Sequence, residues 1–149
     1  MNVRSILSMT SIRCESRVTS KKHALDVLSQ LLAEAAHGPS QGEVMSGLVG
    51  RERLGSTGLG QSIAVPHTRL PGITSKVAAL LKLEEPVDFG SPDGQPVDLL
   101  FGLLVPENSA ETDSREIDVL VNKLRDPELH RELRASSDPK ELYSLFSGL

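Results

Sequence analysis

Residues 51–67 have the sequence RERLGSTGLGQSIAVPH. We interpret this stretch as the end of a helix that carries Arg51, followed by a Ser/Gly loop and a short apolar strand that Pro66 stops. The strand would then present His67, whose imidazole is partly unprotonated near neutral pH and is a competent phosphoryl acceptor. The glycines would let backbone N–H groups converge on an anion, and Arg51 would supply fixed positive charge.

The same stretch has a simpler interpretation as a Gly-rich turn beside an exposed histidine, and composition alone favours that alternative. It is not a nucleotide-binding phosphate loop, because no Gly-Lys-Ser/Thr follows the glycines. The missing lysine and hydroxyl argue against ATP as a donor. A phosphohistidine donor would need neither a nucleotide nor an obligatory metal, since its P–N bond is already activated.

Two helical patterns precede this stretch. The first begins at Ser20 and stops at Gly38-Pro39, with apolar residues recurring along one side. The second begins at Ser40, where Ser40 and Glu43 have the spacing of a capping box, and it continues towards residue 55. We therefore expect two consecutive helices before the loop.

Two strands and further helices follow the stretch. Residues 77–83 and 97–105 are almost wholly apolar, which is typical of buried strands, and turn residues lie between them at 90–94. The last third is helical in pattern, and Asp-Pro pairs at 126–127 and 138–139 predict two helix starts.

This order of elements predicts an α/β fold. We expect a single layered domain over residues 1–149, with a small mixed β-sheet of about five strands flanked by α-helices and a flexible or loosely packed start at residues 1–9. The chain length of 149 residues is sufficient for one such core.

Composition narrows the functional class. A lone Cys14 excludes an internal disulfide and, with only four histidines, argues against a structural zinc site. One Tyr and three Phe leave little for stacking on nucleic acid bases, and no run is long enough to span a bilayer. We expect a cytoplasmic protein without cofactor, metal, nucleic acid or membrane insertion.

Residues 51–67 resemble the signature of the fructose/mannitol-type enzyme IIA family of the bacterial phosphotransferase system, in which Arg-Glu is followed by a Gly-Ser-Thr-Gly loop and an Ala-x-Pro-His ending. Further segments resemble the nitrogen-regulatory branch of that family, and the resemblance covers roughly residues 10–146. These segments are Arg17-Val18, Ser20-Lys21-Lys22, Val87-Asp88-Phe89, residues 96–106, Leu133-Arg134-Ala135 and Glu141-Leu142-Tyr143.

The resemblance implies a phosphotransferase with mainly regulatory output. His67 would accept the phosphoryl group from an HPr-like histidine phosphocarrier protein, and phosphorylation would set which regulatory proteins the domain binds. Arg51 would lie in the site. The loop residues expected to shape the phosphoryl site are Ser56, Thr57, Gly58 and Gly60.

Two residues depart from the family pattern. Ser62 stands where the family usually has Gly, a replacement we expect a small side chain to permit. Asp113 falls where the family usually places a second active-site His. A carboxylate within about 5 Å of a phosphoryl dianion would be repulsive by about one to a few kcal/mol. Alternatively, Asp113 would hydrogen-bond the unphosphorylated His67, or merely cap the helix that follows.

Two alternative functions stay open. Asp113 is compatible with an interaction module that keeps the fold but does not carry phosphate. The second alternative is a sugar-specific IIA component that donates to a fructose- or mannitol-type permease. For the remaining histidines we expect structural roles: His23 and His37 solvated at the ends of the first helix, and His130 on an exposed helical face. Asp93-Gly94 is interpreted as a turn.

Overall fold

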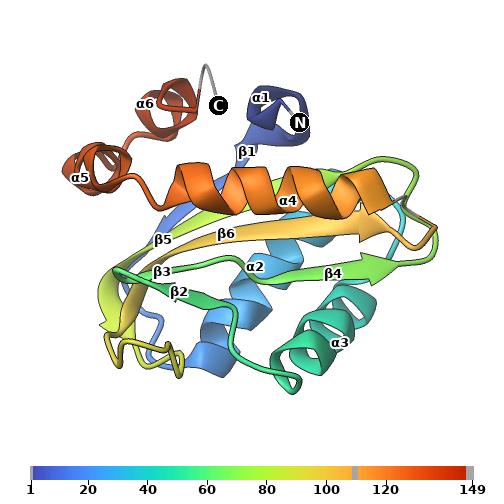
Figure 1. Ribbon diagram of the computed structural model, residues 1–149, viewed down its shortest axis with the longest axis horizontal. Helices are drawn as coiled ribbons and strands as arrows, with labels where there is room; N and C mark the ends of the chain where they lie inside the picture. The colour runs from blue at the N-terminus through green and yellow to red at the C-terminus, as the bar shows by residue number, and fades with distance from the viewer. Residues whose placement is uncertain (1, 109–110, 147–149) are drawn as a thin grey trace.

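The computed structural model describes residues 2–108 and 111–146, with the backbone alone for residues 111–114. One mixed sheet has helices on both faces (Figure 1). Its strands are β1 (Leu7–Glu15), β2 (Gly58–Gly60), β3 (Ile63–Ala64), β4 (His67–Leu70), β5 (Val77–Val87) and β6 (Val97–Pro106). The helices are α1 (Val3–Ile6), α2 (Lys21–Ala36), α3 (Gln41–Glu52), α4 (Glu111–Leu124), α5 (Pro127–Ala135) and α6 (Pro139–Ser144). The predicted α/β class is confirmed, with six strands where about five were expected.

The sheet is ordered β1-β5-β6-β3-β2, and β4 pairs with β6 beyond the end of β3. Strands β5 and β6 are antiparallel and central, whereas β1 runs parallel to β5 and both β3 and β4 run parallel to β6. Within the described residues, no helix is both long and apolar enough to cross a membrane.

The two central strands are buried on both faces, which explains their continuous apolar sequences. Alternate residues enter two separate cores, because successive side chains of a strand point to opposite faces. Leu100 and Leu104 pack with α2 and α3, whereas Phe101 and Leu103 pack with the side of the sheet that α4, α5 and α6 cover. Figure 1 shows α4 lying across this second face.

Helix starts follow the predicted caps. The Ser20 side chain accepts the His23 N–H at the start of α2, and Ser40 and Glu43 form the reciprocal capping box of α3. Asp126 and Asp138 cap α5 and α6 in the same manner, each before a Pro in the first turn. These local signals were sufficient to place four helix starts.

The start of the chain corrects an expectation. Residues 2–9 were expected to be flexible or loosely packed, but Val3 and Leu7 are 1% and 3% exposed and lie in the core under α4 to α6. From Leu7 onward the chain forms β1 along the outer side of β5. Polar residues around Ser8 conceal this strand in the sequence, and its partner is supplied by a segment about 70 residues away.

The sheet is interrupted between β3 and β4, at Val65 and Pro66. The Val65 N–H donates to the Thr57 carbonyl (3.0 Å) and not to β6. Pro66 has no N–H, and its carbonyl accepts the Leu103 N–H (3.0 Å). His67 therefore begins β4 at the point where the edge strand resumes its pairing with β6.

The turn between β2 and β3 shows why Gly is usual at position 62. Gln61 and Ser62 have φ values of 58° and 66°, a region that disfavours residues with a Cβ. Position 62 therefore requires a particular backbone conformation. From the sequence, only the size of its side chain had been expected to matter. Asp93 holds this turn by accepting the Gln61 N–H (2.9 Å). This hydrogen bond and, to a smaller extent, the one from the Gln95 N–H keep the pKa of the Asp93 carboxyl below its usual range. Both bonds agree with the predicted turn.

Helix α3 packs closely on the strand that begins with His67. A Cβ placed on Gly47 would lie 2.9 Å from Thr68 Cγ2 and 3.1 Å from Leu70 Cδ2. Gly50, one turn further on, is exposed, and a Cβ there would meet nothing within 4 Å. The absence of a side chain at Gly47 therefore sets how near α3 lies to β4.

We predict that Gly47→Ala lowers the free energy of unfolding by about 0.5–2 kcal/mol. Overpacking against Thr68 costs about 1–3 kcal/mol, which outweighs the helix-propensity gain of about 1 kcal/mol. Gly50→Ala has the same propensity gain without the clash and should raise stability by about 0.5–1 kcal/mol. Denaturant unfolding of both variants is the measurement, and equal stabilities would contradict the close packing of α3 on β4.

Candidate functional site

The imidazole of His67 is oriented by its own backbone. Its Nδ1 lies 2.8 Å from the carbonyl oxygen of Val65. A carbonyl oxygen can only accept, so Nδ1 carries the hydrogen and donates it. In the neutral ring the free lone pair is then on Nε2, which makes Nε2 the nucleophilic nitrogen. The ring is half-buried, so it is held firmly and still reachable.

His67 lines a hollow of about 170 Å³ between the sheet and α4. The other lining residues are Thr68, Arg69, Val105, Ile117 and Asp118. None of these five was predicted from the sequence to be a site residue. Pairing of β4 with β6 brings Val105 beside Arg69, but the approach of α4 depends on tertiary packing that no local motif signals.

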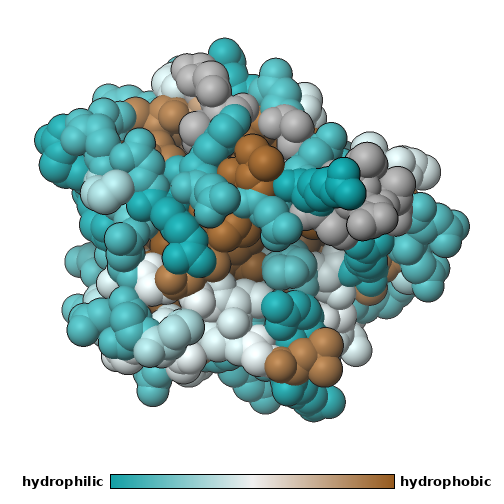
Figure 2. All heavy atoms as spheres, viewed as in Figure 1, coloured by the Kyte–Doolittle hydropathy of each residue, from teal (hydrophilic) through white to brown (hydrophobic). Residues whose placement is uncertain are grey.

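Figure 2 shows hydrophobic atoms gathered in the middle of the face below α4, with hydrophilic side chains around them. Three partly buried residues, Leu59, Ile117 and Val121, pack against the core on this side of the sheet. An apolar surface with a polar rim is the usual composition of a protein-binding face.

Arg51 lies in the last turn of α3, on the same side as Gly47 and one turn beyond it. Because α3 runs opposite to β4 (Figure 1), this turn lies towards the His67 end of the strand. Its Nη1 donates to the Gly55 carbonyl (2.9 Å). Among the described hydrogen bonds, Arg51 contacts the loop and not His67, and the guanidinium keeps further N–H donors for an anion.

The loop after α3 is held by internal hydrogen bonds. The Thr57 N–H and hydroxyl both donate to the Glu52 carboxylate, the N–H at 3.1 Å, and the Gly58 N–H donates to Ser56 Oγ (3.1 Å). The N–H groups of Thr57 and Gly58 therefore have partners within the chain. The expected convergence of loop N–H groups on an anion does not hold for these two residues.

Gly58 and Gly60 lie in β2, where they allow close packing. A Cβ on Gly58 would be 2.9 Å from Ser91 Cβ, and Gly60 has a φ of 90° beside Asp93. Ser56 Oγ donates to the Phe89 carbonyl (2.8 Å), which ties the loop to the segment after β5. These residues shape the neighbourhood of Val65 by packing.

An ion pair between the partly exposed Lys21 and the buried carboxylate of Glu52 supports the loop. Lys21 Nζ lies 2.8 Å from Glu52 Oε2, and the Glu52 side chain is only 6% exposed. The same ammonium group donates to the Phe89 carbonyl (3.2 Å) and lies 4.5 Å from the centre of the Phe89 ring. Glu52, Lys21 and Phe89 all occur in segments that carried the family resemblance, but the sequence assigned them no role.

Asp113 falls in the first turn of α4, and its side chain is outside the described residues. Its expected approach to His67 therefore stays a prediction. The structure does place another carboxylate, exposed Asp118, on the hollow that His67 lines.

The remaining histidines lie away from this hollow. His23 and His37 are exposed at the ends of α2, as expected. His130 corrects the prediction of an exposed face, since it is 4% exposed and its Nε2 contacts the Leu124 carbonyl. Helix α5 folds back on the end of α4, so the residues after Asp126 turn into the core.

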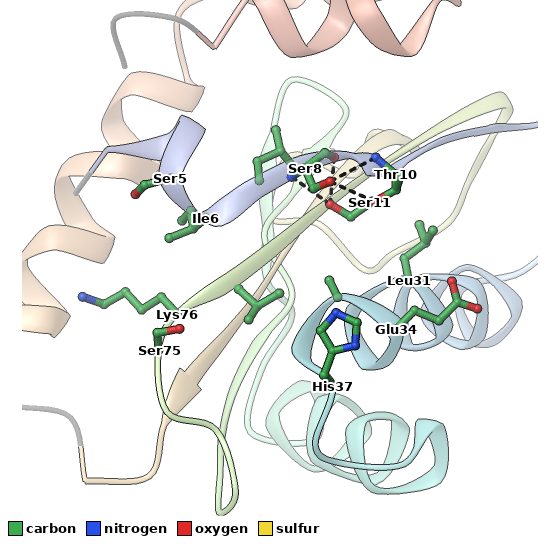
Figure 3. Close-up of a pocket in the computed structure, with 13 residues that line it drawn as sticks. Ser5, Ile6, Ser8, Thr10, Ser11, Leu31, Glu34, His37, Ser75 and Lys76 are labelled. Carbon is green, nitrogen blue, oxygen red and sulfur yellow. Dashed lines mark hydrogen bonds between the residues drawn. The ribbon is translucent and has the colours of Figure 1, made fainter.

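A second hollow, of about 360 Å³, lies between β1, the end of α2 and the start of β5 (Figure 3). Its hydroxyl groups bond to one another or to the backbone: Ser8 to Thr10, and Ser11 to the carbonyls of Ser8 and Ala78. His37 also lines this hollow, but no described hydrogen bond orients its ring, whereas the Val65 carbonyl holds Nδ1 of His67. The smaller hollow, which contains His67, is therefore the candidate site.

Comparison with known proteins shows which family the chain belongs to. Residues 5–148 match the family described as phosphoenolpyruvate-dependent sugar phosphotransferase system, EIIA 2. The nitrogen regulatory protein of Escherichia coli K12 is 36% identical over 148 residues, which are 99% of this chain and 90% of that protein. The corresponding protein of Pseudomonas aeruginosa is 40% identical over 126 residues, 85% of this chain and 82% of that protein.

A solved structure shows the same likeness in three dimensions. The crystal structure of the nitrogen regulatory protein IIA-Ntr from Neisseria meningitidis matches with a TM-score of 0.89 and 34% identity, over 97% of this chain and 98% of that chain. Since the family match and these relatives span nearly the whole sequence, the chain belongs to the EIIA 2 family of the phosphotransferase system and is similar to its nitrogen regulatory proteins.

Proposed function

We propose that this chain is a phosphohistidine carrier and regulatory protein of the nitrogen-related phosphotransferase system. His67 accepts a phosphoryl group from an HPr-like protein, and its phosphorylation state determines which regulatory proteins bind. The observation that carries the proposal is the hydrogen bond from His67 Nδ1 to the Val65 carbonyl, which leaves Nε2 as the free nitrogen of a half-buried ring.

The transfer is a displacement at phosphorus. The Nε2 lone pair attacks the phosphorus atom of the donor's phosphohistidine, the donor's P–N bond breaks, and the donor imidazole leaves with the bonding pair. Nδ1–H remains bonded to the Val65 carbonyl, so the positive charge that develops on the ring is shared with that oxygen. No nucleotide or metal enters this step.

The donor and the regulatory targets would dock on the face that contains the hollow. Val105 and Ile117 supply apolar walls to this hollow, and a docked partner would exclude water from it during transfer. A phosphoryl dianion placed there would change the charge of the binding surface, which is how phosphorylation commonly alters partner choice. Similarity to proteins called nitrogen regulatory favours this role over a sugar-specific IIA component.

We predict that phosphoryl uptake is confined to Nε2 of His67. Incubation with phosphoenolpyruvate, enzyme I and an HPr homologue should add one phosphoryl group, about 80 Da by intact mass, which acid removes and alkali does not. ¹⁵N NMR of the adduct should show phosphorus on Nε2, because Nδ1 is occupied by the Val65 carbonyl. The adduct should survive a chelator.

The controls use histidines outside the site. His67→Gln should abolish uptake, whereas His23→Gln and His37→Gln should leave it unchanged, since both residues are exposed at the ends of α2. A His67→Gln protein that still gained the phosphoryl mass would disprove the assignment. A phosphoryl group found on Nδ1 would disprove the proposed orientation.

For Arg51 we predict a role in stabilising the transferred charge. Arg51→Ala should slow transfer roughly ten- to a thousandfold, the loss expected for one charge-assisted contact of about 1.4–4 kcal/mol. Arg51→Lys should recover only part, because it lacks the planar fork. Arg53→Ala, two residues on and exposed, is the matched control. Equal transfer rates for Arg51→Ala and Arg53→Ala would remove Arg51 from the site.

The Asp113 prediction concerns retention of the phosphoryl group. If its carboxylate faces His67, it opposes the dianion by about one to a few kcal/mol. Asp113→His should then shift the transfer equilibrium with the donor towards phosphorylated His67, and Asp113→Asn should do so to a smaller extent. Equilibrium constants measured for the three proteins decide. Identical values would assign Asp113 to helix capping alone.

A further inference from the structure

A continuous series of contacts leads from Lys21, at the start of α2, to the His67 ring. Lys21 pairs with Glu52, and the Glu52 carboxylate accepts both the N–H and the hydroxyl of Thr57. The Thr57 carbonyl accepts the Val65 N–H, and the Val65 carbonyl accepts His67 Nδ1–H. The series thus connects the start of α2, the end of α3 and the loop after it to the segment that carries His67.

We propose that Glu52, held by Lys21, is a positioning residue for phosphoryl transfer. It fixes Thr57, and through Thr57 it fixes the Val65 carbonyl that orients the His67 imidazole. The effect on transfer rests on the function proposed above, whereas the effect on ring orientation is a property of the unphosphorylated protein and can be measured without transfer.

The burial of Glu52 is the first support. A carboxylate that is 6% exposed requires compensation, and this one has an ammonium group at 2.8 Å together with two donors from a single residue. Because the charge of Lys21 cancels that of Glu52, the pair as a whole adds no net negative charge beside a site that must accept a dianion. A neutral pair can brace the loop without opposing phosphorylation.

The interruption of the sheet at Pro66 is the second support. Ser62 and Pro66 direct their carbonyls to β6, so Val65, one residue before Pro66, directs its backbone groups to the other side, where its N–H has the Thr57 carbonyl as acceptor. The direction of the Val65 carbonyl thus depends on where Thr57 lies. Thr57 is in turn buried and tied to Glu52 through both its N–H and its hydroxyl group.

The Phe89 carbonyl connects Lys21 to the loop by a second route. It accepts from Lys21 Nζ at 3.2 Å and from Ser56 Oγ at 2.8 Å, so the loop and the lysine are tied to the same fixed point. Glu52 and Phe89 therefore hold adjacent residues of one loop, Thr57 and Ser56, from two sides. The Arg51 guanidinium, by contrast, donates to the Gly55 carbonyl at the beginning of the loop.

The test measures the protonation pattern of His67 in the unphosphorylated protein by ¹⁵N NMR, together with the transfer rate. In the unaltered chain the Nδ1–H tautomer should dominate. Glu52→Ala should lower the Nδ1–H fraction and slow transfer roughly ten- to a hundredfold, as expected for a misplaced reacting group. Lys21→Met and Thr57→Val should shift the tautomer fraction in the same direction by a smaller amount.

The controls separate positioning from general stability. Lys22→Met removes an exposed positive charge next to Lys21, and Glu85→Ala removes an exposed carboxylate elsewhere in the chain. Both variants should leave the tautomer fraction and the rate unchanged. Thr57→Ser retains the hydroxyl donor and should restore the pattern that Thr57→Val loses. A purely structural role would lower the melting temperature of the variants without moving the tautomer fraction.

An unchanged tautomer fraction in folded Lys21→Met and Thr57→Val would overturn the proposal, even if Glu52→Ala failed to fold. The failure of the proposed function would look different, because the unaltered chain would then take up no phosphoryl group while the tautomer shifts could still be present. The two ideas are therefore tested by separate measurements on the same proteins.

Discussion

The interruption of the sheet at Val65-Pro66 is the constraint on which the candidate site depends. Pro66 cannot donate to β6, so the pairing of β3 with β6 is interrupted there, and it resumes as β4 at His67 in the same register. In the gap, the Val65 carbonyl is free to accept the His67 Nδ1–H. One residue without an N–H thus creates both the position of the histidine and the hydrogen bond that selects its nucleophilic nitrogen.

On its other side the segment is held by the loop after α3. The Thr57 carbonyl accepts the Val65 N–H, and the buried Glu52 carboxylate, paired with the partly exposed Lys21, holds Thr57. Residues from the start of α2, the end of α3 and the segment after β5 meet at this point. The Gly-rich loop could have offered its N–H groups to an anion. At Thr57 and Gly58, however, these groups are bonded within the chain and stabilise the loop.

The two faces of the sheet differ in how they are packed. On one, α2 and α3 pack tightly, and Gly47 lets α3 approach β4 until Thr68 fills the space a side chain would need. On the other, α4 covers the sheet (Figure 1), and a hollow of mixed polar and apolar lining remains beside His67. Rigid packing behind the histidine and an accessible face in front of it suit a residue that exchanges a group with another protein.

The sequence by itself determined the elements whose signals are local. Ser20, Ser40, Asp126 and Asp138 cap helices through their own neighbours within three residues. The continuous apolar runs of β5 and β6 likewise identified the centre of the sheet. The stretch ending at His67 suggested a candidate nucleophile through its resemblance to a known family, because its Pro and Gly residues by themselves also fit a plain turn beside an exposed histidine.

Tertiary structure alone decided the rest. Strand β1 depends on pairing with β5, the burial of His130 depends on how α5 folds onto α4, and the role of Glu52 depends on residues far away in the chain. The sequence suggested that only side-chain size matters at Ser62, whereas the turn in the structure requires a positive φ there. In each case the deciding partner comes from another part of the chain, and periodicity and capping patterns report only on near neighbours.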